Sequence, residues 1–165
     1  MIAQLPPGLK NLLIIMALVS LAQVALPKTG FDVEMLYLFY PDSEHFRLWQ
    51  LFTHIFCHGG IGHLLFNGLA LFSFGAIVEY RLGTSRFLQL FFAAAVGAVL
   101  VHFLQMGYTL FTHTGTLFPN HVAGFEAVPY GPMIGASGAV YGVMVAFAYL
   151  YPNESLVFLF IPWST

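Results

Sequence analysis

The uncharged stretch FLQLFFAAAVGAVLVHFLQMGYTLF, residues 87–111, decides the fold class of this chain. An α-helix needs about 20 apolar residues to cross a bilayer, and similar uncharged runs recur along the sequence. We therefore expect an all-α, polytopic transmembrane helix bundle that forms a single membrane domain over residues 1–165. The expected spans are residues 11–27, 60–79, 87–111 and 132–151, with a partial fifth span from about residue 155.

The composition excludes most other classes of protein. Of the 165 residues, 59% are apolar and only 7% are charged, and the mean hydropathy is +0.82. A soluble domain of this size does not bury so much apolar surface, and a disordered chain needs low hydrophobicity and high charge. The net charge of −2 leaves no basic patch for a nucleic acid partner. The single cysteine, Cys57, excludes an internal disulfide and a zinc site built from several cysteines.

The basic residues predict the orientation in the membrane. Lys10 precedes the first span, and Arg81 and Arg86 follow the second. Because cytoplasmic loops carry more Lys and Arg, this favours a cytoplasmic N-terminus and places residues 28–53 and 112–131 outside. We expect an integral protein of a bacterial cytoplasmic (inner) membrane. A cleaved signal peptide is the alternative for the first span, but its cleavage site would be poor.

The connection between the first two spans, residues 28–53, is long and rich in Phe, Tyr and Trp. Tyr and Trp favour the headgroup level of a bilayer. We predict a structured loop that lies in the outer interface. An ordinary external loop with scattered aromatic side chains is the alternative that the composition leaves open.

Polar side chains inside a membrane are functional candidates because burying them is expensive. One group leads into the second span and consists of His54, His58, His63 and Asn67. His63 and Asn67 are four residues apart and share one helix face, where both side chains can donate hydrogen bonds. A polar seam between helices, with each group satisfied by a neighbour, is the alternative.

Distances along the helices place a serine at the same depth. Asn67 lies 11 residues before Val78, which is about 17 Å of helix. Ser137 lies 13 residues before Leu150, which is about 20 Å. Both spans run from outside to inside in the expected topology, so we predict that Ser137, Asn67 and His63 meet in one outward-facing cavity.

Ser137 lies among glycines that form two G-x-x-x-G spacings, Gly131, Gly135, Gly138 and Gly142. Such spacings commonly serve close helix packing. A serine flanked by glycine near a helix N-terminus also has exposed backbone N–H groups beside it, which are the donors that an oxyanion hole needs. Both interpretations stay open from these residues alone.

A metal site is a further alternative for the histidines that lead into the second span. His54 and His58 are four residues apart, with Cys57 between them. The segment has no HExxH motif and no carboxylate to act as a base. We therefore expect no metal and no other cofactor. We predict instead that His54 and His58 hydrogen-bond the 28–53 loop and stabilise the mouth of the cavity.

Taken together, these residues resemble those of the rhomboid intramembrane serine proteases, over roughly residues 10–160. The pair His-x-x-x-Asn, followed in the right order by Gly-x-Ser-Gly, makes the match specific. The residues that carry it are Phe52-Thr53-His54 with His58, His63 and Asn67, then Gly135-Ala136-Ser137-Gly138 with Tyr141, then Glu79-x-Arg81-Leu82-Gly83, and Trp49 in the loop. We also interpret Glu79 to Gly83 as a charged helix end with a glycine C-cap.

The resemblance implies a six-helix core and a serine-type endopeptidase that cleaves transmembrane segments of membrane proteins within the lipid bilayer. Ser137 would be the nucleophile that forms an acyl-enzyme, and His63 and Asn67 would be oxyanion donors. No cofactor would be needed, and the partners would be transmembrane protein substrates. The supporting residues would be Tyr141, which stacks on the catalytic base, and Gly135, Gly138, His54 and His58.

The sequence departs from the family pattern at two places. Gln50 follows the loop tryptophan, where the family often has Arg, and this affects one loop contact. The family's general base is a His on the sixth helix, which residues 1–165 do not include. We therefore expect an incomplete core that is inactive on its own, with the Gly138/Gly142 face meant to pack against the sixth helix.

Two other functions are weighed against the protease. A rhomboid-like pseudoprotease would bind membrane proteins without cutting them; the missing base favours it, and the retained Ser137, His63 and Asn67 disfavour it. A small channel or transporter would need charged residues in mid-membrane, and the first four spans contain none there.

Overall fold

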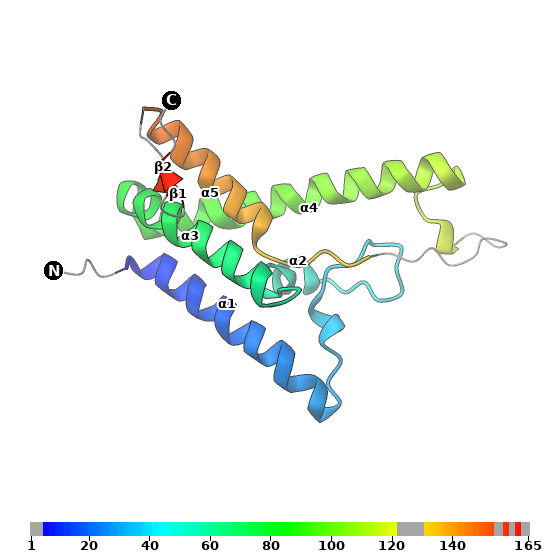
Figure 1. Cartoon of the computed structure of the whole chain (residues 1–165). Coiled ribbons are helices and arrows are strands. Elements are labelled where there is room, and N and C mark those ends of the chain that lie inside the picture. The colour runs from blue at the N-terminus through cyan, green and yellow to red at the C-terminus, as the bar shows by residue number, and fades with distance from the viewer. Residues whose placement is uncertain (1–4, 122–130, 154–156, 159–160, 163–165) are drawn as a thin grey trace.

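The computed structural model describes residues 5–121, 131–153, 157–158 and 161–162 (Figure 1). Within these residues the bundle consists of α1 (Pro7–Ala25), α3 (Ile61–Leu82), α4 (Thr84–Thr114) and α5 (Ser137–Leu150). The shorter helical elements are η1 (Leu26–Thr29), η2 (Val33–Leu36), α2 (Gln50–Thr53), η3 (His54–Phe56) and η4 (Pro119–His121). The strands β1 (Val157–Phe158) and β2 (Ile161–Pro162) form an antiparallel pair.

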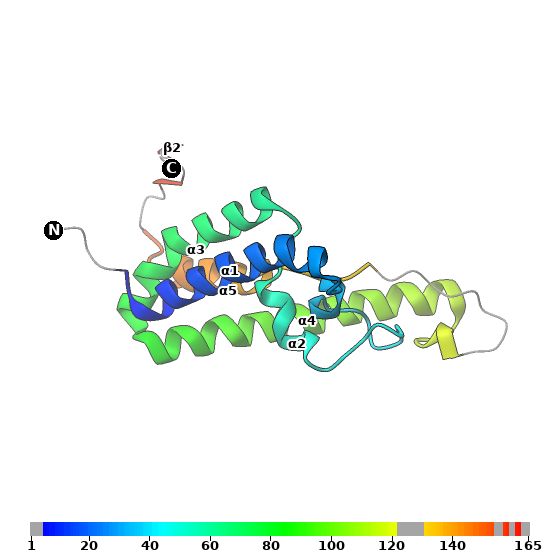
Figure 2. The same ribbon diagram turned by 90° about the horizontal axis from the view of Figure 1, so that it is seen from below.

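Helix α3 contacts each of the other three long helices, α1, α4 and α5. Helix α5 also packs against α4. Figure 2 shows α3 and α4 on opposite sides, with α1 and α5 between them. The core between these helices is apolar, and its fully buried side chains include Leu9, Met16, Leu71, Phe87, Phe91 and Val143.

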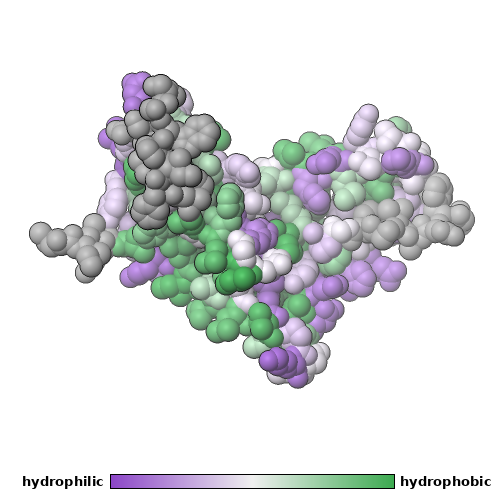
Figure 3. Space-filling view, viewed as in Figure 1, coloured by the Kyte–Doolittle hydropathy of each residue, from purple (hydrophilic) through white to green (hydrophobic). Residues whose placement is uncertain are grey.

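The outer faces of the helices are also apolar. Large side chains are exposed there, among them Leu104 at 74% and Val145 at 68%, and Figure 3 shows hydrophobic residues across the middle of one face. Pro7–Thr29, α3 and α4 are long and apolar enough to cross a membrane. A helix satisfies its own backbone hydrogen bonds in lipid. The chain is therefore an integral membrane protein with an all-helical bundle, as the sequence predicts.

Glycine brings α4 and α5 into close contact. A Cβ atom at Gly138 would overlap the Cβ of Ala98, and one at Gly142 would overlap that of Ala94. The Gly138/Gly142 face therefore packs against α4, and the prediction that it faces a sixth helix is wrong. Small residues on both helices let the two backbones approach, which is the packing role of this spacing.

The fourth span begins later than the sequence predicts. Residues 131–136 are not helical, since Met133 and Leu38 exchange backbone hydrogen bonds of 2.7 and 3.0 Å, and Gly135 has a φ of 105°. A positive φ is incompatible with a right-handed helix. Helix α5 therefore starts at Ser137 and has 14 residues, about 21 Å of helix.

The partial fifth span predicted from about residue 155 is not seen as a helix. The described residues in that segment form β1 and β2. Pro162 lies in this hairpin, and proline has no N–H to donate to a helix and disfavours a helical conformation in the residue before it.

Glu79 of α3 ties α1 to the bundle. Its carboxylate is buried and accepts hydrogen bonds from the N–H groups of Gly8 (2.8 Å) and Leu9 (2.6 Å) and from the Thr84 hydroxyl (2.7 Å). N–H groups in the first turn of a helix lack partners in the helix, and a negative charge is favourable there. The predicted glycine C-cap at Gly83 is confirmed, but the sequence interpretation missed this role of the carboxylate.

Gln50 organises the loop of residues 28–53 from within. Its side chain is fully buried, and Oε1 accepts from the N–H groups of Arg47 (3.0 Å) and Phe39 (3.4 Å). Its Nε2 donates to the carbonyls of His45 (2.9 Å) and Met35 (3.4 Å). The loop is therefore structured, as predicted, and Gln50 supplies both acceptor and donor where an arginine would only donate. Its position in the membrane interface stays a prediction.

Replacing Glu79 should weaken the attachment of α1. Glu79→Ala leaves buried N–H groups without an acceptor, so we expect the free energy of unfolding to fall by about 2 kcal/mol or more. Glu79→Gln keeps one acceptor oxygen and should lose less. The measurement is unfolding in mixed micelles, with the exposed Glu34→Ala as control. Equal effects of Glu79→Ala and Glu34→Ala would contradict this role.

Candidate active site

Ser137, His63 and Asn67 lie around one cavity of about 180 Å³ between α3 and α5. The depth arithmetic predicts this meeting of residues that are 70 positions or more apart in the sequence. The cavity is otherwise mostly apolar. The residues that line it are His63, Phe66, Asn67, Ala70, Ser137, Val140, Tyr141 and Met144.

Ser137 is the first residue of α5. The helical hydrogen bond from the Val140 N–H to the Ala136 carbonyl is 2.9 Å long, so the amides of Ser137 and Gly138 precede this ladder. N–H groups in such a first turn are free to bind an external oxygen. None of the hydrogen bonds among the described residues engages the Ser137 hydroxyl. A nucleophile and backbone donors therefore lie at the same end of one helix.

Asn67 carries an unused donor into this cavity. Its side chain is only 2% exposed, and its Nδ2 has no hydrogen-bond partner among the described residues. Buried polar groups nearly always find partners, and leaving one unpaired costs about 1–3 kcal/mol. In a polar seam between helices Asn67 would be satisfied by a neighbour. The unpaired donor therefore favours a site that binds an oxygen over a purely structural seam.

The position of the proton on the His63 ring follows from its neighbour Gly59. The backbone N–H of Gly59 donates to Nδ1 of His63 over 3.3 Å, so Nδ1 is an acceptor. A neutral ring then carries its proton on Nε2. An ideal Cβ at Gly135 would lie 2.7 Å from that Nε2 and 3.6 Å from Nδ2 of Asn67. Both side-chain donors thus approach the backbone that leads into Ser137.

Gly135 is required at its position for two reasons. Its φ of 105° lies in a region that L side chains rarely adopt. Any Cβ there would also collide with the His63 ring. Its N–H donates to the His54 carbonyl over 2.8 Å, which joins the segment before α5 to the segment before α3.

His54 and His58 support the site in different ways. Nδ1 of His54 lies 2.7 Å from the Gln50 carbonyl, so the predicted bond to the 28–53 loop is present. The His58 ring instead contacts the Phe56 carbonyl (3.1 Å) and the Ser20 hydroxyl (3.2 Å). The prediction that His58 also bonds the loop is therefore wrong, because the preceding turn directs its ring toward α1.

Burial favours the neutral forms of His54, Cys57 and His58, which precede α3. It lowers the pKa of His58 to about 4, with the neighbouring His63 ring as a second cause, and it also lowers the pKa of His54. Burial raises the pKa of the Cys57 thiol to about 11, which disfavours the thiolate that would bind a metal. Among the described residues, no three His, Cys, Asp or Glu side chains are grouped to hold a metal ion.

Tyr141, which is predicted to support the site, lines the cavity and is 64% exposed.

The sequence interpretation missed several other polar residues. Gln23 of α1 and Gln50 of the loop form buried or half-buried hydrogen bonds that no motif predicts. His102 of α4 belongs to no motif, yet its Nε2 is buried without a partner among the described residues. A polar side chain inside an apolar run is the signal that marks Gln23 and His102.

In this membrane-spanning bundle, a serine at the start of one helix lies beside two side-chain donors of a neighbouring helix. A family model described as Rhomboid domain matches residues 45–164, which is most of the chain. The chain belongs to the rhomboid family.

Similar proteins include named proteases. The chain is 37% identical over 111 residues to the rhomboid protease GluP of Bacillus subtilis (strain 168), covering 67% of this chain and 17% of GluP. It is 32% identical over 118 residues to RHOMBOID-like protein 12, mitochondrial, of Arabidopsis thaliana, covering 70% and 34%. It is 32% identical over 98 residues to the rhomboid protease GlpG of Salmonella choleraesuis (strain SC-B67), covering 58% and 34%. The chain thus spans about a third or less of these relatives.

Acid should destabilise this protein through His58. The histidine pKa is about 6.5 in an unfolded chain, whereas that of folded His58 is about 4, so between these values only the unfolded state binds the proton. The free energy of unfolding should therefore fall as the pH drops from about 6.5 to about 4. In His58→Gln the loss of melting temperature over this range should be smaller. The exposed His113→Gln serves as control, and identical pH profiles of the two variants would refute the assignment.

Proposed function

We propose that this chain forms the nucleophile and oxyanion part of an intramembrane serine endopeptidase that cleaves transmembrane segments of membrane proteins. The observation that carries the proposal is the unpaired Nδ2 of Asn67, which lines the same cavity as the Ser137 hydroxyl. A donor buried at this energetic cost is useful if an oxygen arrives there during the reaction. The named protease relatives GluP and GlpG support the same reaction class.

The chemistry begins at Ser137. Its Oγ attacks the carbonyl carbon of a peptide bond while its proton passes to a general base, and the carbonyl oxygen becomes an oxyanion. The Nε2–H of His63, the Nδ2–H of Asn67 and the Ser137 amide stabilise this charge. Collapse of the tetrahedral species expels the amine, which takes up a proton, and leaves an acyl-enzyme. Water then hydrolyses this ester and restores the serine.

The general base must be a group other than the residues described so far around the Ser137 hydroxyl. No histidine or carboxylate among the described residues hydrogen-bonds to the Ser137 hydroxyl. His63 accepts a hydrogen bond from the Gly59 N–H at Nδ1, and its Nε2 is assigned here to the oxyanion. The resemblance to the family implies a base on a later helix of the core, which would also stack on Tyr141. A serine hydroxyl without a base is a weak nucleophile.

The surroundings of the cavity suit an apolar substrate. Phe66 and Tyr141 line it and are 59% and 64% exposed, so it opens onto an apolar outer face of the bundle. A transmembrane segment in the bilayer would approach the serine sideways across this face. In a bacterial inner membrane, the charge distribution favours a cytoplasmic N-terminus, which would place the cavity toward the outside.

Reaction with a fluorophosphonate distinguishes the protease from a pseudoprotease. We expect the complete product of this gene to be labelled at Ser137, and Ser137→Ala to abolish labelling. Residues 1–165 alone should label at least tenfold more slowly, because no described base reaches the hydroxyl. The readout is the mass of the labelled peptide. A complete product that folds but stays unlabelled would favour the pseudoprotease.

The two side-chain donors should matter more for turnover than for folding. One oxyanion donor contributes about 2.7–4 kcal/mol of transition-state stabilisation, a factor of about 10²–10³ in kcat. We expect Asn67→Ala to lose up to this factor, and less if His63 compensates. The melting temperature should change little, since the Asn67 donor has no partner to lose. If Asn67→Ala combined with His63→Ala leaves cleavage of a transmembrane substrate intact, the polar-seam interpretation holds instead.

A further inference from the structure

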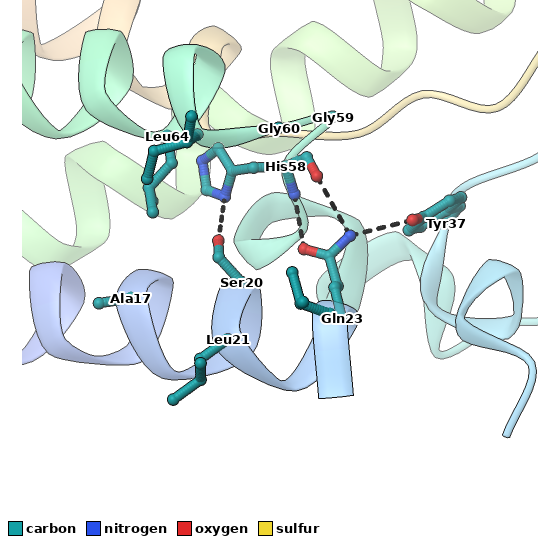
Figure 4. Close-up of a pocket in the computed structure, with 11 residues that line it drawn as sticks. Ala17, Ser20, Leu21, Gln23, Tyr37, His58, Gly59, Gly60 and Leu64 are labelled. Carbon is teal, nitrogen blue, oxygen red and sulfur yellow. Dashed lines mark hydrogen bonds between the residues drawn. The ribbon is translucent and has the colours of Figure 1, made fainter. Parts of the chain in front are cut away.

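Gln23 of α1 holds the main chain of His58 (Figure 4). Its Oε1 accepts a hydrogen bond from the His58 N–H over 2.8 Å, and its Nε2 donates to the His58 carbonyl over 3.2 Å. The same Nε2 donates to the Tyr37 hydroxyl over 3.0 Å. A carboxamide in an apolar helix is expensive unless such bonds are formed. The Gln23 carboxamide therefore binds the main chain of a single residue, His58, which lies 35 positions further along the chain.

The peptide bond between His58 and Gly59 connects the Gln23 side chain to His63, which lines the cavity around Ser137. Its carbonyl, from His58, accepts from Gln23, and its N–H, from Gly59, donates to Nδ1 of His63. A trans peptide is planar, so its C=O and N–H point in opposite directions. Holding the carbonyl toward α1 therefore directs the N–H toward His63.

Packing alone does not hold this peptide in place. Gly59 has no Cβ and rotates easily about φ. A cavity of about 480 Å³ lies beside the carbonyl, lined by Gln23, His58 and Gly59 among others (Figure 4). In a flipped peptide the carbonyl oxygen would face Nδ1 of His63, which would then need its proton on Nδ1 to donate. Nε2 would become an acceptor and be lost as an oxyanion donor.

We propose that Gln23 is a positioning residue for catalysis, which holds the His58–Gly59 peptide so that His63 keeps its proton on Nε2 beside Ser137. The proposal rests on the proposed function and extends its machinery to the first helix. Ser20 offers a matched comparison on the same helix. Among the described residues its hydroxyl hydrogen-bonds to the side chain of His58, at 3.2 Å from Nδ1, and not to the His58–Gly59 peptide.

The first experiment reads the tautomer directly and needs no proteolysis. Protein labelled with ¹⁵N in its histidine rings is placed in lipid nanodiscs, and the His63 signals are assigned by their loss in His63→Ala. Wild type and Ser20→Ala should show a protonated Nε2 and an unprotonated Nδ1. Gln23→Met should shift a large share of His63 to the opposite tautomer. If Gln23→Met keeps the wild-type tautomer, the proposal is wrong even if the protein is a protease.

The second experiment measures cleavage by the complete gene product. Gln23→Met should lower kcat about tenfold or more with little change in KM, because the donor acts in the transition state. Combined with His63→Ala, it should add little further loss, since both changes remove the same donor. A purely structural role would instead give losses that multiply and a matching fall in melting temperature.

A second variant covers the case in which Gln23→Met does not fold. Gln23→Glu keeps an acceptor for the His58 N–H, and when ionised it removes the donations to the His58 carbonyl and to the Tyr37 hydroxyl. It should therefore show the same tautomer shift at neutral pH, and the wild-type tautomer in Gln23→Glu would overturn the proposal. If the complete product labels no serine but the tautomer shifts as expected, the geometry stands and the proposed function fails.

Discussion

The hydrogen bond from the Gly135 N–H to the His54 carbonyl is the contact on which the site depends. It joins the non-helical segment before α5 to the short turn before α3, two places far apart in the chain. Because Gly135 has no Cβ, this segment passes directly against the His63 ring. The start of α5 is thereby set beside the donor face of α3, and Ser137 reaches the cavity at the depth of Asn67.

The buried and half-buried polar side chains of the bundle include two kinds, those that are hydrogen-bonded to the main chain and those with a polar atom unpaired among the described residues. Glu79, Gln50 and Gln23 use their side chains to satisfy main-chain groups of other segments, and each thereby fixes a connection that apolar packing would leave loose. Asn67 is the opposite case, with a donor that has no partner among the described residues. An unsatisfied donor is costly in an apolar bundle, and its place beside Ser137 is the observation that supports the proposed reaction site.

Much of the architecture could be predicted from local properties. The uncharged runs predict α1, α3 and α4, because span length depends only on bilayer thickness and helix rise. The meeting of His63, Asn67 and Ser137 follows from the same arithmetic, since helices that cross one membrane share a common depth scale. The fourth span was predicted too long, because the bonds of Met133 to Leu38 compete with helix formation and involve a distant partner.

The sequence by itself determined the membrane class and the main spans, and it predicted that His63, Asn67 and Ser137 meet in one cavity. Only the tertiary structure decided the tautomer of His63, the grip of Gln23 on His58 and the anchoring of α1 by Glu79. Hydropathy and helix periodicity are properties of neighbouring residues, so they can be read along the chain. A hydrogen bond between side chain and backbone over 35 or 71 positions depends on the direction of one peptide group, and that direction exists only once the helices have packed.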